Sequence, residues 1–271
     1  MIDLPAYLIV WTLGAAIGSF LNVVIYRIPA HLSVFWPPSR CPKCLHQLKV
    51  YDNVPVLGWL WLKGRCRYCH TPISSRYPIV EGVMGFLFLL IFCVSGLTWQ
   101  TLGFWIFFSW LFALAMIDLD TMTLPNVLTQ SGLVVGLGFQ VIQGGFTDFN
   151  HVVIIKAFMG GILGAVLGLW LFDIIGFVGS IAFGETAMGG GDPKLAAMMG
   201  AWLGWKYLLL AGFLACALGA FVGGGAIALG WLDRRQPMPF GPFLALGAGI
   251  TALCGEMILS TYLHLFFPTI H

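Results

Sequence analysis

The sequence predicts an all-α protein that crosses the membrane several times. Hydrophobic residues make up 59% of the 271 residues and charged residues only 9%, and the mean hydropathy is +0.92. Soluble domains do not have this balance, whereas polytopic membrane proteins do. The apolar residues also gather in stretches of about 20, the length that an α-helix needs to cross a bilayer. We therefore expect about eight transmembrane helices.

The expected spans follow from these apolar stretches, with ends good to a few residues. The sixth and seventh are separated at Gly204-Trp205-Lys206, because Arg234 and Arg235 must return to the cytoplasm. Eight crossings place both termini outside, whereas a single long span in this region would give seven and move the C-terminus inside. The eight spans are 5–26, 78–96, 101–117, 127–143, 151–175, 192–204, 207–231 and 242–265.

The positive charges place the largest loop in the cytoplasm. Eight of the 13 Lys and Arg residues lie between Arg27 and Arg76, and positively charged loops stay cytoplasmic. The first apolar stretch has its basic flank after it rather than before it, so we interpret it as a retained helix and not a cleaved signal. The predicted domains are a first transmembrane helix (1–26), a cytoplasmic module (27–77) and a membrane core (78–271).

Four cysteines in this loop predict a structural zinc site. The pairs "CPKC" (Cys41, Cys44) and "CRYC" (Cys66, Cys69) are separated by 21 residues, close to the spacing of zinc ribbons. Four thiolates close a tetrahedral site, which would stabilise a module too small for a secure core. Disulfides or free thiols are the alternatives, although a reducing cytoplasm disfavours disulfides. We interpret the neighbouring His46 and His70 as bystanders, and the cysteines of the apolar spans, Cys93, Cys216 and Cys254, as small core residues.

Acidic residues at membrane depth predict a catalytic pair. Asp118 and Asp120 end the third span in "AMIDLDTMTLPN", and Asp192 begins the sixth in "MGGGDPK". The predicted topology brings both segments to the cytoplasmic face, where Asp118 and Asp192 can meet. Two facing carboxylates share one proton, so one can activate a water while the other protonates a scissile carbonyl. This is aspartyl-protease chemistry.

Each aspartate also has a structural alternative. Asp192 suits a helix N-cap before Pro193, and Asp118 could mark a helix end at the interface. Asp120 points away from Asp118 if the helix continues, so we expect it to be solvated. Glycines at Gly189 and Gly191 would let an extended substrate backbone approach closely.

The remaining helix-end residues, glycines and acidic residues are given no chemical role. Leu124-Pro125 should break the helix and Asn126 should cap the next one. Glu81 places a favourable charge near a helix N-terminus, Gly223-Gly224-Gly225 marks a possible kink, and Asp173 and Glu256 receive no assignment. Small residues four apart predict close helix packing; they are Gly14, Gly18, Gly160, Gly164, Gly168, Gly219 and Gly223.

The chain resembles the type IV prepilin peptidases, also called prepilin leader peptidase/N-methyltransferases, over nearly its whole length. The motifs are "GSFLNVVIYRIP", "CPKC", "NVPVLGWL", "KGRCRYC", "RYPIVE", "IDLDTMTLPN", "GGGD" and "PFGPFLALGA". The resemblance implies that Asp118 and Asp192 are the catalytic aspartates of an inner-membrane enzyme. It also implies cleavage of a basic leader after glycine and N-methylation of the new N-terminal residue with S-adenosyl-L-methionine. The chain departs from the family at Gly190, where tyrosine is frequent, and at Asn126, where an acid is common.

The resemblance also implies partners. These are prepilins or type II secretion pseudopilins and the lipid bilayer, with no nucleic acid. The methyl donor is polar and arrives from the cytoplasm, so we expect its pocket to involve the cytoplasmic module, with Gly64 and Glu81 as candidate residues. Two other classes of function remain open: an ion-coupled transporter using the paired aspartates, and a zinc-dependent adaptor without chemistry.

Overall fold

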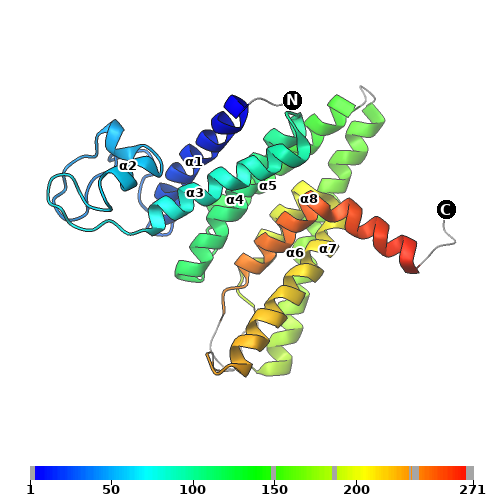
Figure 1. Cartoon of the computed structure of the whole chain (residues 1–271). Helices are drawn as coiled ribbons and strands as arrows, with labels where there is room; N and C mark the ends of the chain where they lie inside the picture. Colours follow the sequence, from blue (N-terminus) through cyan, green and yellow to red (C-terminus); the bar gives the residue numbers. More distant parts are fainter. Residues whose placement is uncertain (1–3, 148–150, 185–187, 232, 234–237, 267–271) are drawn as a thin grey trace. The chain divides into compact units, whose positions relative to one another are not determined.

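The computed structural model describes residues 4–147, 151–184, 188–231, 233 and 238–266. Within these residues, seven helices are long and apolar enough to cross a membrane, which confirms the predicted all-α multi-pass fold. Arg234 and Arg235, on which the cytoplasmic return of the chain was predicted, lie outside the described residues. The seven helices are α1 (Leu4–Arg27), α3 (Arg76–Ser95), α4 (Trp99–Thr121), α5 (Asn126–Thr147), α6 (His151–Phe183), α7 (Asp192–Ala228) and α8 (Gly241–Phe266) (Figure 1).

The chain forms two compact units. Unit 1 covers Met1–Ser109 and unit 2 covers Trp110–His271. Unit 1 holds α1, α3, the cysteine-containing loop, the short 3-10 helix η1 (Val50–Asn53) and the short helix α2 (Leu57–Trp61). Unit 2 holds the last part of α4 and helices α5 to α8.

Glycines bring α1 and α3 into backbone contact in unit 1. A Cβ atom at Gly14 would lie 2.7 Å from the Met84 carbonyl oxygen, and one at Gly18 would lie 2.8 Å from the Glu81 Cα. Only glycine permits this approach, and close backbone packing is what holds helices together in lipid. The predicted packing role of Gly14 and Gly18 is therefore confirmed.

Helix α7 folds back on itself at Gly204, which has a non-helical φ of 74° and ψ of 171°. Gly168 of α6 packs against Ala196, and Phe172, one helical turn away on α6, lies 3.1 Å from a Cβ placed on Gly212. In a straight helix Ala196 and Gly212 would be about 24 Å apart, so both can meet α6 within one turn only if the two arms of α7 run in opposite directions.

This reversal accounts for the predicted sixth and seventh spans. The predicted break at Gly204 is confirmed, and α7 contains both spans, which is why seven long helices are found where about eight were expected. The first arm, 192–203, rises only about 18 Å and does not span a hydrocarbon core of roughly 30 Å by itself. The kink considered at Gly223-Gly224-Gly225 is wrong, because the helix is regular there.

Helix α8 returns antiparallel to the second arm of α7. Gly247 packs against Ala211, and Gly255 packs against Tyr207, nearer the start of that arm. Gly219, further along the arm, lies beside Phe240, just before α8 begins. The start of α8 therefore lies beside the late part of α7.

Candidate active site and metal centre

Asp118 lies in the last turn of α4 and its side chain points at the start of α8. The residue is only 5% exposed, and its Oδ2 accepts a hydrogen bond of 2.8 Å from the backbone N–H of Gly241, the first residue of α8. A helix N-terminus presents unpaired N–H groups and partial positive charge, so it favours a carboxylate at this place. Gly241 is required sterically, because a Cβ there would lie 2.7 Å from Asp118 Oδ2.

Asp192 is the first residue of α7 and is 6% exposed. Its Oδ2 accepts a hydrogen bond of 3.1 Å from the Gly189 N–H, which precedes the helix. The N-cap position is occupied by Gly191, and no side chain caps this helix end. The capping alternative for Asp192 is therefore wrong. Its carboxylate is oriented instead by the three glycines before it, Gly189-Gly190-Gly191, which we call the glycine segment.

The two carboxylates lie close enough for the charge of Asp118 to act on Asp192. They come from α4 and α7 and are 74 residues apart in sequence, yet both belong to unit 2. Within the described part of the chain, neither forms a salt bridge. Asp120 is exposed, as expected of a residue that points away from Asp118.

The glycine segment has two different surroundings. Gly189 is exposed, and a Cβ there would make only an ordinary contact of 3.5 Å with Asp192 Oδ2, so a substrate backbone has room to approach. Gly191 is small for another reason: a Cβ there would lie 2.7 Å from the Cβ of Leu124. Its expected part in substrate approach stays a prediction, beside this packing role.

Two contacts of the site were not foreseen from the sequence. One is the Gly241–Asp118 hydrogen bond, whose only sequence signal is a glycine before a proline at the start of an apolar stretch. The other joins Lys194 Nζ to Asn126 Oδ1 at 2.7 Å. Asn126 thus begins α5 and also binds the first turn of α7, rather than acting only as the expected cap.

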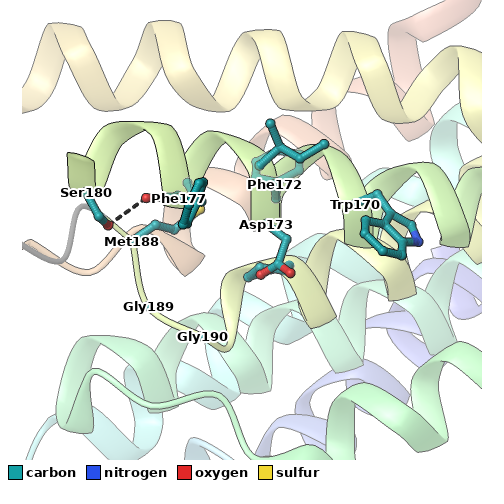
Figure 2. A pocket seen from close by; sticks show the side chains of 11 residues that line it. Trp170, Phe172, Asp173, Phe177, Ser180, Met188, Gly189 and Gly190 are labelled. Atoms are coloured by element: carbon teal, nitrogen blue, oxygen red, sulfur yellow. Dashed lines mark hydrogen bonds between the residues drawn. The ribbon is translucent and has the colours of Figure 1, made fainter. Parts of the chain in front are cut away.

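A cavity of about 420 Å³ opens beside Asp192 (Figure 2). Gly189, Gly190 and Pro193 form one wall, and α6 forms the other with Phe172 and Asp173 among its residues. The flanking Gly190 is exposed, and a Cβ there would meet nothing within 4 Å. The cavity therefore reaches the segment that orients Asp192.

The four predicted cysteine ligands meet in unit 1. The sulfur atoms of Cys41, Cys44, Cys66 and Cys69 all lie within 4.8 Å of one another. The Sγ atoms of Cys41 and Cys69 are 3.7 Å apart, and those of Cys44 and Cys66 are 4.0 Å apart. Four Zn–S bonds of about 2.3 Å in a tetrahedron require sulfurs about 3.8 Å apart, so the cluster fits such an ion. No disulfide joins cysteines in the described residues.

The two cysteine pairs are held by the same local structure. Cys41 N–H donates to the His46 carbonyl (3.0 Å), and Cys66 N–H donates to the Thr71 carbonyl (2.9 Å). Each loop contains one residue with positive φ, Leu45 at 58° and His70 at 54°. The repeated geometry is that of two knuckles that point their thiols at one centre.

The thiols of the cluster differ in how readily they ionise. The hydrogen bond of Cys69 with the Thr71 hydroxyl, at 3.3 Å, and next the backbone of Thr71 lower the pKa of Cys69 to about 6. In contrast, the backbone of His46 lowers the pKa of Cys44, but burial and the neighbouring thiols outweigh it and raise that pKa to about 11. The thiolate is the form that binds metals.

The two candidate residues for the methyl donor are engaged within unit 1. Gly64 has a φ of 68°, and a Cβ there would lie 2.7 Å from the Trp59 ring, so it forms the tight turn before the second knuckle. Glu81 is buried, and its Oε2 accepts a 2.7 Å hydrogen bond from the N–H of Val56, whose φ of 60° is rare for a β-branched residue. Both residues are buried and position the loop, and their expected part in binding the methyl donor stays a prediction.

Comparison with known proteins gives consistent matches along the chain. Residues 12–95 match the bacterial peptidase A24 N-terminal domain, and residues 105–224 match the type IV leader peptidase family. The prepilin leader peptidase/N-methyltransferase of Aeromonas hydrophila is 38% identical over 94% of this chain and 93% of its own length. The protein of the same name from Pseudomonas aeruginosa is 33% identical over 93% of this chain and 91% of its own length.

No solved structure matches the chain. The sequence matches nevertheless cover both cysteine pairs and the two aspartate segments, and the two relatives are 38% and 33% identical over almost the full length. The chain therefore belongs to the type IV prepilin leader peptidase/N-methyltransferase family, peptidase family A24.

Proposed function

We propose that this protein removes the leader peptide from type IV prepilins or type II secretion pseudopilins and then methylates the new N-terminal amine. Asp118 and Asp192 perform the cleavage. The observation that carries this proposal is the placement of two buried carboxylates from distant segments within electrostatic reach of each other, beside an open cavity.

The cleavage follows from a pair that shares one proton. The ionised carboxylate takes a proton from a water molecule, whose oxygen attacks the scissile carbonyl carbon, while the protonated carboxyl donates its proton to the carbonyl oxygen. Collapse of this intermediate breaks the C–N bond and protonates the leaving amine. Gly189 leaves space for the locally extended substrate backbone that this chemistry needs.

The second reaction uses S-adenosyl-L-methionine, which supplies an electrophilic methyl group to the amine that cleavage exposes. Because this donor is polar, we place its pocket at the cytoplasmic module. Zinc held by Cys41, Cys44, Cys66 and Cys69 would be structural, because four protein sulfurs leave no position open for a substrate.

We propose that the protein lies in the inner membrane. Its cysteine module and its two catalytic aspartates face the cytoplasm, and both termini lie in the periplasm. The basic residues of the 27–77 loop support it, since such loops stay cytoplasmic. The Gly241–Asp118 bond supports it too. It puts the start of α8 at the level of Asp118, which requires the chain to return to the aspartates after α7.

The direct test incubates the purified protein with a prepilin and S-adenosyl-L-methionine and measures the product mass. We expect a product that has lost the leader and gained one methyl group. An unchanged prepilin would overturn the peptidase assignment, and a cleaved but unmethylated product would overturn the methyltransferase assignment.

The dyad is tested by single substitutions. Asp118→Asn and Asp192→Asn should each abolish cleavage, because an amide can neither take the proton from water nor share it. Asp120→Asn is the matched control and should retain most activity, since Asp120 is exposed at the same helix end. Prepilin should still bind to the inactive variants, which separates loss of chemistry from loss of folding. Robust cleavage by the Asp192→Asn protein would exclude the aspartyl mechanism.

A further inference from the structure

We propose that the cavity beside Asp192 binds a lysine or arginine side chain of the substrate's leader peptide, with Asp173 of α6 as its acidic partner. This inference rests on the proposed peptidase function, and it adds a residue that selects and positions the substrate. Asp173 is not part of the proton-transferring pair.

The cavity connects Asp173 with the segment that carries Asp192. Asp173 lines one wall, from α6, and Gly189, Gly190 and Pro193 line the opposite wall. Figure 2 shows the Asp173 side chain pointing from α6 toward the beginning of α7. A substrate lying along the glycine segment would therefore pass the Asp173 carboxylate.

The register of the helices puts Asp173 at the level of the dyad. Gly168 of α6 packs against Ala196, and a Cβ on Gly176 would lie 3.3 Å from the Met188 side chain. Because α6 and the first arm of α7 are antiparallel, the residues between these two contacts face each other. Asp173 is thus level with the turn that precedes α7 and leads into Asp192.

Among the described residues, the Asp173 carboxylate has no partner of opposite charge. It is exposed, and it forms no hydrogen bond or salt bridge with the residues that the structure describes. The cation closest in sequence on the facing arm, Lys194, is bonded to Asn126. A carboxylate within a membrane-length helix is costly and marks a binding or transport role by default.

The remaining walls match a long basic side chain. Phe177 and Met188 give the cavity an apolar lining along which the methylene groups of Lys or Arg can lie while the charged end reaches Asp173. An apolar substrate side chain would leave the carboxylate unpaired in this cavity. The leader of the proposed substrate is the basic part of the chain and precedes the scissile bond, so its charge arrives beside the dyad.

The test compares two prepilins, one with its natural basic leader and one with each leader Lys and Arg replaced by Gln. For the basic leader, Asp173→Asn should lower kcat/KM about tenfold through a higher KM, because a charge-assisted hydrogen bond is lost. For the neutral leader, wild type and Asp173→Asn should have equal kcat/KM. Glu256→Gln is the matched control, an exposed acid on α8 away from the cavity, and should change neither value.

A charge exchange completes the test. Asp173→Lys should cleave a prepilin with an acidic leader better than one with a basic leader, which reverses the preference of the wild type. An equal loss for basic and neutral leaders would show a structural role and overturn the proposal, as would the absence of any loss. Wild-type cleavage of the basic prepilin reports separately on the peptidase function, so failure of the two ideas is distinguishable.

Discussion

The two aspartates are each oriented by one glycine N–H. Gly241 donates to Oδ2 of Asp118 and Gly189 donates to Oδ2 of Asp192, at 2.8 and 3.1 Å. The other oxygen of each carboxylate accepts no hydrogen bond from the described residues, which leaves it available to water and substrate. Backbone donors fix the carboxylates without adding a positive charge. A positive charge would favour ionisation of both carboxylates, and the proton that they share would be lost.

Replacement of Gly241 by alanine should therefore inactivate cleavage. The new Cβ would lie 2.7 Å from Asp118 Oδ2, so the carboxylate must move, and a displacement of about 1 Å costs on the order of a hundredfold in rate. Cleavage of a prepilin by purified protein measures the effect. Gly138→Ala, at an exposed helical glycine with nothing within 4 Å, is the control and should be near wild type. Full activity of Gly241→Ala would show that the hydrogen bond does not set the geometry of the site.

At the scale of elements, the cysteine module is a pair of short loops that need a cross-link. Its helical parts, η1 and α2, have four and five residues, and its two antiparallel bridges are isolated pairs, Arg40 with Gln47 and Arg65 with Pro72. Such elements bury little apolar surface. The four converging sulfurs are the feature that can join the two knuckles.

The purified protein should carry about one zinc ion per chain, measured by elemental analysis. Replacing Cys41 and Cys44 by serine should remove the metal and increase proteolytic cutting between residues 27 and 77, because one knuckle then loses its link to the other. Replacing Cys93 by serine is the control, since this cysteine lies on α3 outside the cluster. Carefully prepared wild-type protein without stoichiometric metal would contradict the zinc assignment.

Gly64→Leu should impair methylation more than cleavage. The substitution places a side chain against the Trp59 ring at a φ of 68°, so it distorts the loop before the second knuckle while the aspartates lie in the other unit. Cleaved and methylated products are followed separately on one prepilin. Gly96→Leu has a similar φ of 65° but open space around it, and should affect neither reaction strongly. Equal loss of both activities by Gly64→Leu would show that the two sites are not divided between module and core.

At the scale of the whole molecule, local patterns predicted the helices but not the contacts between them. Apolar length located the spans, and the interruption at Gly204-Trp205-Lys206 located the break in α7, since both signals are local. The bond between Asp118 and Gly241 joins residues 123 apart and depends on tertiary packing. The span in α6 was expected to end at residue 175, but the helix continues to Phe183. The thickness of the bilayer limits the length of the membrane-crossing part and not the length of the helix. The extension beyond residue 175 forms part of the cavity wall.

The fold-back of α7 predicts which side of the membrane each later segment occupies. The first arm of α7 begins at Asp192, and the second arm reaches the level of Asp118 again near Gly219, which lies beside Phe240. The loop after α7 should therefore be cytoplasmic, and α8 should carry the C-terminus to the periplasm. A membrane-impermeant maleimide applied to intact cells should label a cysteine added after His271. It should not label Asp233→Cys, in the loop after α7, until the membrane is opened. Phe35→Cys, which is 90% exposed in the 27–77 module that we propose to face the cytoplasm, is the control for an inside position. A straight α7 would give the opposite result, with Asp233→Cys labelled from outside and the C-terminal cysteine protected.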